Sequence, residues 1–270
     1  MASEFGDRER FFIVTAGRTG SSLLASILAA AGADFGMPAD QNWDESEGGS
    51  FEHPSIVRAA SAFRAAFELS PTKPQSIYSR LRWTLTRHGG KAHLRRALRS
   101  ARFFKAVSLD LVIPVVIKLG YFPRLIVNHR SFAEHALSFS QMFPHRSIGV
   151  LEADFLRTYR NALMQLHLYG GCVVGYDELI DPSRQDWVAP LAALTGLEAA
   201  HLLAARQGRG GRAGTAQHPL PGFSDQAEQI CSSIAAMAGQ TIPPSRHALR
   251  NWLRQAQSPV VRLKTPSVAQ

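Results

Sequence analysis

The segment from residue 10 to residue 28 limits the folds open to this chain more than any other segment. Residues 10–16 read Arg-Phe-Phe-Ile-Val-Thr-Ala, a short apolar run with β-branched and aromatic residues that predicts a buried strand. Gly17 ends the run, and either Ser21 or Ser22 can cap a following helix. Leucine and isoleucine at positions 23, 24, 27 and 28 give that helix an apolar face. A strand, a tight turn and a helix in immediate succession are typical of α/β proteins.

The rest of the chain continues this alternation. Further buried strands are expected at 103–107, 124–129 and 172–176, and polar or glycine-rich loops at 35–55 and 207–222. Helices are expected at 56–100, 109–118, 132–142, 186–194, 198–205, 224–238 and 245–256. The alternation predicts a three-layer α/β sandwich, in which helices cover both faces of a central parallel sheet. We expect residues 1–256 to form a single domain and residues 257–270 to form a C-terminal tail.

Composition excludes several classes of protein. Hydrophobic residues make up 45% of the chain, which is too many for a disordered protein, yet no apolar run is long enough for a membrane span. The N-terminus has neither the basic nor the apolar part of a signal peptide. Two cysteines, Cys172 and Cys231, provide no disulfide framework and no zinc spacing. We therefore expect a cytoplasmic protein.

The formal net charge of +9 favours anionic partners, and the excess is concentrated in one stretch. Residues 78–105 contain no acidic residue. The cations in this stretch are Arg80, Arg82, Arg87, Lys91, Arg95, Arg96, Arg99, Arg102 and Lys105. Two interpretations stay open: a solvated helical face, or a basic rim that touches an acidic or membrane surface. No helix-turn-helix, zinc or RNA-binding motif accompanies these cations, so we expect no nucleic-acid partner.

The turn between the first strand and its helix has the composition of an anion site. It reads Thr15-Ala16-Gly17-Arg18-Thr19-Gly20-Ser21-Ser22. Glycines permit a tight turn, and the helix N-terminus offers unpaired N–H groups and a partial positive charge. Arg18 adds a guanidinium that matches phosphate oxygens. The lysine that an ATP-type phosphate loop carries after its second glycine is missing, so this turn does not predict a magnesium nucleotide, and we expect no metal.

This turn resembles the 5′-phosphosulfate loop of the PAPS-dependent sulfotransferase family, in which PAPS is 3′-phosphoadenosine 5′-phosphosulfate. The matching residues are Arg18, Thr19, Gly20, Ser21 and Ser22, with Arg18 at the place of a lysine in the eukaryotic cytosolic branch. The family also has a strand that ends in an arginine, with a serine eight residues later, and both hold the 3′-phosphate. Residues 125–130 resemble that strand, with Arg130 at its end and Ser138 as the eighth residue after it.

Three further segments resemble the family in the expected order. Lys105 resembles a lysine at the end of an upstream strand, and it would assist the leaving group. Tyr176 begins a segment, Tyr-Asp-Glu-Leu, whose tyrosine lies near the adenine in relatives. Arg206 and Gly208 resemble the start of a late Arg-x-Gly-x-x-Gly loop that closes over the 3′-phosphate. The resemblance implies a P-loop-NTPase-like sulfotransferase fold, with residues 35–101 as an insertion on the acceptor side.

The resemblance also bears on the general base. The cytosolic branch has a histidine two residues after the upstream lysine, where this chain has Val107. Bacterial and heparan-type relatives use a glutamate in the loop after the first helix. Glu52 and His53 lie in a similar Gly-x-Phe-Glu segment, so Glu52 is the first candidate for the base and His53 the second.

The function implied is transfer of a sulfuryl group from PAPS to a hydroxyl of a glycan, a lipid or a small metabolite. Three alternatives remain at this stage. A nucleotide kinase with the same type of sheet would require magnesium and ATP. A catalytically inactive relative would bind PAPS or its product PAP, 3′-phosphoadenosine 5′-phosphate, without transfer. A basic module that binds nucleic acid or a membrane surface would use residues 78–105.

Overall fold

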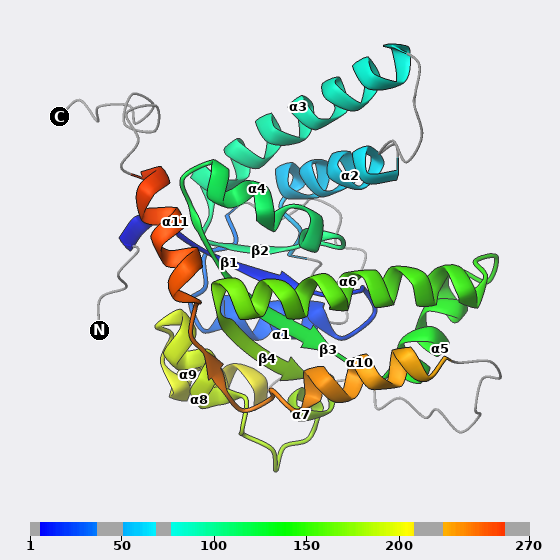
Figure 1. Ribbon diagram of the computed structural model, residues 1–270. Coiled ribbons are helices and arrows are strands. Elements are labelled where there is room, and N and C mark those ends of the chain that lie inside the picture. Colours follow the sequence, from blue (N-terminus) through cyan, green and yellow to red (C-terminus); the bar gives the residue numbers. More distant parts are fainter. Residues whose placement is uncertain (1–5, 37–50, 69–76, 208–223, 257–270) are drawn as a thin grey trace.

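The computed structural model describes residues 6–36, 51–68, 77–207 and 224–256, and its centre is a five-stranded sheet of order β2-β1-β3-β4-β5 (Figure 1). The strands are β1 (Glu9–Val14), β2 (Phe103–Lys105), β3 (Phe122–His129), β4 (Gly171–Gly175) and β5 (Thr241–Ile242). The first four run parallel, and β5 pairs antiparallel with β4. The predicted strands are therefore confirmed, but the sheet is mostly rather than wholly parallel.

Alternation along the strands sends side chains to two separate cores. Phe11 and Ile13 of β1 face one core, which they share with α1 (Ser21–Ala30), α8 (Val188–Thr195) and α9 (Ala199–Gln207). Phe12 and Val14 face the other core. That second core is covered by α2 (Pro54–Glu68), α3 (Ile77–Ser100), α4 (Ile113–Lys118), α5 (Phe132–Met142), α6 (Ile148–Tyr169) and α10 (Asp225–Ala235). The result is the predicted three-layer α/β arrangement, because helices cover both faces of the sheet.

The shorter elements refine two of the sequence predictions. The expected helix 109–118 is divided into a 3-10 turn, η3 (Leu109–Leu111), and α4, with Pro114 in the first turn of α4, where a proline removes no helical hydrogen bond. Residue 176, expected at the end of a strand, instead begins α7 (Tyr176–Ile180). The remaining elements are η1 (Gly6–Arg8) and α11 (Arg246–Ala256). Most of the expected loops at 35–55 and 207–222 and the tail 257–270 lie outside the described residues.

Helices α2 and α3 form an antiparallel hairpin that extends beyond the edge of the sheet (Figure 1). Ile56, Ala59 and Phe63 of α2 are buried in the same core cluster as Leu94 and Leu98 of α3. A Cβ on Gly90 would lie 3.3 Å from the ring of Phe63, so glycine lets the two helices approach closely there. The predicted helical character of 56–100 is confirmed on both sides of residues 69–76. Over the described residues, no helix combines the length and the apolar character that a membrane crossing requires.

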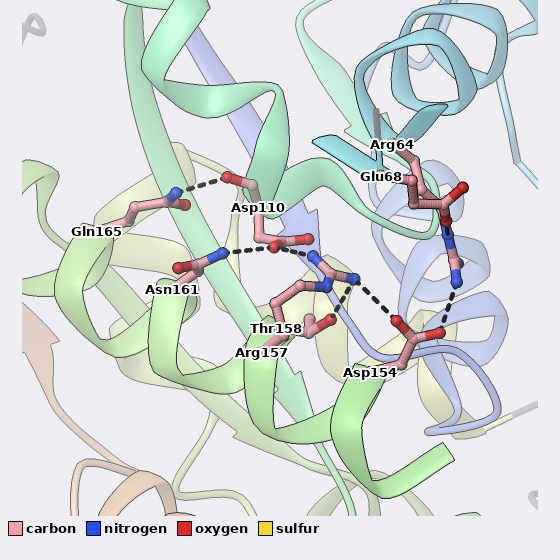
Figure 2. A network of polar contacts seen from close by, with 8 residues as sticks. All are labelled: Arg64, Glu68, Asp110, Asp154, Arg157, Thr158, Asn161 and Gln165. Atoms are coloured by element: carbon pink, nitrogen blue, oxygen red, sulfur yellow. Dashed lines mark hydrogen bonds and ion pairs between the residues drawn. The ribbon is translucent and has the colours of Figure 1, made fainter. Parts of the chain in front are cut away.

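A buried carboxylate ties the segment after β2 to helix α6 (Figure 2). The Asp110 side chain has no exposed surface, and its Oδ2 accepts from Arg157 Nη1 at 2.5 Å and from Asn161 Nδ2 at 2.8 Å. Gln165 Nε2 donates to the Asp110 carbonyl oxygen at 2.6 Å. Burial raises the pKa of Asp110, while Arg157 and the Asn161 hydrogen bond act in the opposite direction. The carboxylate is therefore tolerated in the core because it is paired.

The same network continues to the α2–α3 hairpin. Arg157 lies 3.7 Å from Asp154, whose other oxygen accepts from Arg64 Nη2 of α2 at 2.6 Å. Arg64 also pairs with Glu68 one turn later on α2. Helix α6 thus holds both α2 and the segment after β2, and these two segments flank the candidate site described next (Figure 2).

Candidate functional site

The residues that the sequence singled out gather at the carboxyl ends of the parallel strands. The turn 15–20 follows β1, Lys105 ends β2, Arg130 follows β3, and Tyr176 follows β4. Strands β1 and β3 are neighbours, but the chain leaves β1 toward β2 on one side and leaves β3 toward β4 on the other side. In open α/β sheets, ligands bind outside the carboxyl ends of the strands at such a switch point. The topology therefore collects segments more than a hundred residues apart at one edge of the sheet.

The turn after β1 depends on left-handed backbone at three positions. Gly17 has a φ of 84°, Arg18 of 50° and Gly20 of 79°. At Gly20 the absence of a side chain is also a packing requirement, because a Cβ there would lie 2.0 Å from Cδ2 of Tyr176. The ring of Tyr176 therefore lies directly against the turn, as part of the wall that a ligand in the turn would face.

Hydrogen bonds among buried hydroxyl groups hold the turn in place. Thr15 Oγ1 and Thr19 Oγ1 are 2.5 Å apart, and Gly17 N donates to Thr15 Oγ1 at 3.0 Å. Thr19 Oγ1 donates to Asn128 Oδ1 of β3 at 2.8 Å, and the hydroxyl of Tyr159 donates to the Asn128 carbonyl oxygen at 2.8 Å. The Thr19 side chain is fully buried. Its hydroxyl, predicted to bind the nucleotide, bonds instead to Asn128 as part of this support.

Helix α1 begins at Ser21, one of the two residues expected to cap it. The capping position is occupied by Gly20, and no side chain caps the helix. The first N–H groups of α1 lack partners within the helix, as in every α-helix, and their dipoles point toward the turn. The Ser22 hydroxyl accepts from Lys105 Nζ at 2.8 Å, so Ser22 binds the end of β2 to the first turn of α1.

Lys105 joins this helix start to the loop before α2. Its side chain is 3% exposed, and its Nζ lies 3.5 Å from Glu52 Oε1 as well as 2.8 Å from Ser22 Oγ. A buried ammonium requires such partners, because desolvation of an isolated charge is costly. The side chain of Glu52 is 19% exposed, so its carboxylate remains accessible beside the turn. The structure thus brings together two of the three predicted catalytic residues.

The third, His53, faces a different direction. Its Nδ1 accepts from Ser55 N at 3.1 Å, and its Nε2 lies 3.1 Å from Ser100 Oγ at the end of α3. The Ser100 hydroxyl donates to the Ala97 carbonyl oxygen, so His53 Nε2 is the donor in the contact with Ser100. Burial lowers the pKa of His53. Nδ1 therefore binds the first turn of α2, and Nε2 links it to the end of α3. Because both ring nitrogens are engaged, Glu52 is favoured over His53 as a base.

Arg130 lies between an acidic residue and an aromatic ring. Its Nε and Nη2 are 3.2 Å and 3.4 Å from the Glu134 carboxylate, and its guanidinium carbon is 4.3 Å from the centre of the Tyr176 ring. Ser131 caps α5 by accepting from Glu134 N, and its hydroxyl donates to the Glu134 carboxylate. Glu134, which the sequence analysis did not single out, therefore fixes the orientation of Arg130.

Ser138 meets Arg18 rather than Arg130. Arg18 Nε donates to Ser138 Oγ at 3.3 Å, which links the turn after β1 to helix α5. His135, one helical turn before Ser138, bonds through Nδ1 to the Gly17 carbonyl oxygen at 2.9 Å. Burial lowers the pKa of His135 and of His129 to about 4, so both are neutral at neutral pH. The two motifs predicted separately as 5′- and 3′-phosphate sites are therefore in direct contact.

Arg206 does not join this group of residues. Its Nε donates to the Leu179 carbonyl oxygen at 2.9 Å, and its Nη1 donates to the Pro182 carbonyl oxygen at 3.2 Å. These bonds fasten α9 to the end of α7, which is a structural role and differs from the predicted contact with a 3′-phosphate. Gly208, its predicted partner, lies outside the described residues.

Comparison of the chain with protein-family models, with curated proteins and with solved structures found no match in any of the three. Among the described residues, no group of histidine, cysteine, aspartate and glutamate side chains has the arrangement of a metal site. Both cysteines are buried, and burial raises the pKa of each thiol. The functional argument therefore rests on the geometry described above.

The contact between Gly20 and Tyr176 gives a first prediction. Alanine at Gly20 is expected to lower the free energy of unfolding by more than alanine at Gly196, measured by urea denaturation. Both glycines are left-handed, with φ of 79° and 75°, so each substitution has the backbone cost of about 1–2 kcal/mol. A Cβ at Gly196 meets nothing within 4 Å, whereas at Gly20 it collides with Tyr176 and adds about 1–3 kcal/mol. Equal losses in the two variants would contradict the close contact.

Proposed function

We propose that this chain is a PAPS-dependent sulfotransferase, and that its sheet and helices form the P-loop-NTPase-like fold of that family. The observation that carries the proposal is the convergence of Arg18, Lys105, Arg130 and Ser138 at one edge of the sheet, with Glu52 beside Lys105. These residues come from five separate segments, and the sequence resemblance assigns all of them to one donor site and its base.

The cationic groups fit a donor that carries phosphate at both ends. The N-terminus of α1 and the guanidinium of Arg18 suit the 5′-phosphosulfate, because a helix start and an arginine both favour anions. Arg130 suits the 3′-phosphate. A guanidinium has five donors, and Glu134 accepts from only two of its nitrogens, so others remain for phosphate oxygens. The ring of Tyr176 is 4% exposed and lies between the turn and the Arg130 guanidinium, so it supports Arg130 at the predicted nucleotide site.

Glu52 and Lys105 have different roles in sulfuryl transfer. Glu52 accepts the proton of the acceptor hydroxyl while that oxygen forms a bond to sulfur. The bond from sulfur to the 5′-phosphate oxygen breaks at the same time, and PAP leaves with the electron pair. Lys105 and the first N–H groups of α1 stabilise the negative charge that develops on the departing oxygen. The acceptor is a hydroxyl compound of a class that these residues do not specify.

The two buried free cysteines suit a reducing compartment, so we also propose a cytoplasmic location. A nucleotide kinase is disfavoured because no lysine follows Gly20 in the turn. An inactive relative would bind PAP at the same site as an enzyme, so an assay of sulfuryl transfer is needed to distinguish the two.

Calorimetry with PAP in the absence of magnesium tests the donor site. The unmodified protein is expected to bind PAP and to bind ATP weakly or not at all. Arg130→Ala is expected to weaken PAP binding by about tenfold or more, since a hydrogen bond to a charged group contributes about 1.5–3 kcal/mol. Arg146→Ala, at an exposed cation beyond the end of α5, is the control and should leave binding unchanged.

Each other outcome has a definite meaning. Magnesium-dependent binding of ATP without binding of PAP would replace the sulfotransferase proposal with the kinase. Binding of neither nucleotide would remove the proposed function altogether. Binding of PAP without transfer from PAPS to any of a panel of glycan, lipid and phenolic hydroxyls would identify an inactive relative.

A further inference from the structure

The outer face of α3 is a concentration of positive charge that the proposed reaction does not use. Helix α3 contains no acidic residue along its whole length. Within its described part, the buried side chains Leu94, Ala97 and Leu98 face the core. The opposite side is exposed, at Leu85, His88, Ala92, Arg95, Arg96 and Arg99. Helical periodicity therefore separates a core face from a cationic face on the same helix.

Three arginines of this face have no acidic partner among the residues that the structure describes. Arg95, Arg96 and Arg99 form no ion pair within the described part of the chain. Arg102, just beyond the helix, is also exposed and contacts the ring of Phe11. A helix rises about 1.5 Å per residue, so this charge forms a continuous strip rather than a single point. Such a strip creates a local positive potential that attracts an anionic surface.

One exposed apolar side chain accompanies the cations on this face. Leu85 is 62% exposed on the cationic face of α3. Phe67, which is 54% exposed near the end of α2, lies instead on the side of α6, with the Arg157 guanidinium carbon 5.9 Å from the centre of its ring. The hairpin itself projects beyond the sheet, so it can meet a flat surface before the rest of the molecule does (Figure 1).

We propose that the outer face of α3 binds the surface of an anionic lipid bilayer. Lipid headgroups neutralise the arginines, and the interfacial region of a bilayer accepts the exposed Leu85 side chain. A nucleic-acid duplex would also neutralise the arginines, but it offers no favourable environment to Leu85. The bilayer therefore accounts for both the arginines and the leucine of this face. The inference depends on the surface of α3 alone and not on the proposed transfer reaction.

Sedimentation with phosphatidylcholine vesicles, with and without phosphatidylserine, tests this inference. The full chain is expected to bind only the vesicles that contain phosphatidylserine, and added salt should weaken the binding. Each arginine near the surface contributes about a fivefold increase in partition. The triple variant Arg95→Gln/Arg96→Gln/Arg99→Gln should therefore bind roughly 100-fold more weakly. Leu85→Ser should weaken binding further, in the same direction.

A matched control tests whether vesicle binding depends on the α3 face or only on the net charge of the chain. Arg246, Arg250 and Arg254 are exposed on α11, and replacing all three with glutamine removes the same charge elsewhere. This control should keep its vesicle binding. The proposal would be overturned if the two triple variants lost vesicle binding equally, or if the unmodified chain did not bind phosphatidylserine vesicles at all. It would also be overturned if the chain bound duplex DNA more tightly than vesicles and the α3 variant lost that DNA binding. The α3 variant should keep the urea unfolding midpoint of the unmodified chain, which shows that it is folded. Because this control does not use PAP, failure of the vesicle test and failure of the proposed function remain distinguishable.

Discussion

Replacing Glu52 with glutamine is expected to lower the turnover of sulfuryl transfer by about 100-fold or more while PAP affinity stays nearly unchanged. General-base catalysis by a positioned carboxylate contributes about 10²–10⁴ in rate, and glutamine keeps the shape of glutamate without a basic oxygen. The expectation follows from the proposed function, because Glu52 contacts Lys105 beside the helix start and has no contact with the residues assigned to the 3′-phosphate. Single-turnover kinetics with PAPS measures the chemical step.

The pair with Lys105 makes a control necessary, since glutamine also removes a charged partner of a buried ammonium. Lys105→Met and Lys105→Met/Glu52→Gln separate the two effects, because neither variant contains an ammonium that could lose this partner. A base is identified if adding Glu52→Gln to Lys105→Met lowers turnover by a further factor similar to that seen in the unmodified chain. Glu198→Gln, at an exposed carboxylate just before α9, should behave like the unmodified enzyme. Unchanged turnover in Glu52→Gln would remove Glu52 from this role, and PAP binding measured in parallel would show whether the donor site survives.

The sheet was predictable wherever a strand is buried on both faces. The run Phe11 to Val14 contributes to two cores at once, so each of its positions is apolar and the strand is visible without any structural information. Strand β5 consists of two residues, Thr241 and Ile242, neither of them buried, and it carries no such signal. Its antiparallel pairing with β4 arises from the path of the chain after α10, which local sequence does not encode.

Helix α6 is the largest element that the sequence analysis missed, although its pattern is present. Leu151, Phe155, Ala162 and Leu166 are buried and recur at helical spacing over its twenty-two residues. Its polar positions include Asp154 and Arg157, which belong to the network that connects the buried Asp110 to α2 (Figure 2). These polar side chains interrupt the apolar pattern of α6. The residues that pair with them lie on α2 and η3, far away in the sequence, so the sequence of α6 alone does not account for them.

The candidate site was predictable in position but not in the direction of its side chains. Motif order located Arg18, Lys105 and Arg130, and sheet topology then brought them to one edge. Whether a hydroxyl or a guanidinium faces a ligand depends on partners elsewhere in the chain. The Thr19 hydroxyl turns inward because Asn128 accepts from it, and Arg206 turns to the Leu179 carbonyl oxygen. No pattern local to Thr19 or Arg206 contains that information.

Replacing Arg157 with alanine is expected to lower the free energy of unfolding by about 3–5 kcal/mol, because it leaves the buried Asp110 carboxylate without its cation. Asp110 Oδ1 already lacks a hydrogen-bond partner, so only Asn161 would remain on the side chain. The measurement is urea unfolding at neutral pH. Arg160→Ala, one position after Tyr159 on the same helix, removes an exposed arginine that donates to Gln226, and it should cost less than about 1 kcal/mol.

A double-mutant cycle shows whether the loss comes from a stranded charge or from lost side-chain contacts. Asp110→Asn is neutral and nearly the same size, so adding it to Arg157→Ala should recover part of the stability. Burial already raises the pKa of Asp110, and without Arg157 it rises further. The folded state then binds a proton that the unfolded state releases, so the deficit of Arg157→Ala should shrink as the pH falls below neutrality. A deficit that is independent of pH and is not relieved by Asp110→Asn would mean that the Arg157 side chain stabilises the fold by its contacts, rather than by its charge.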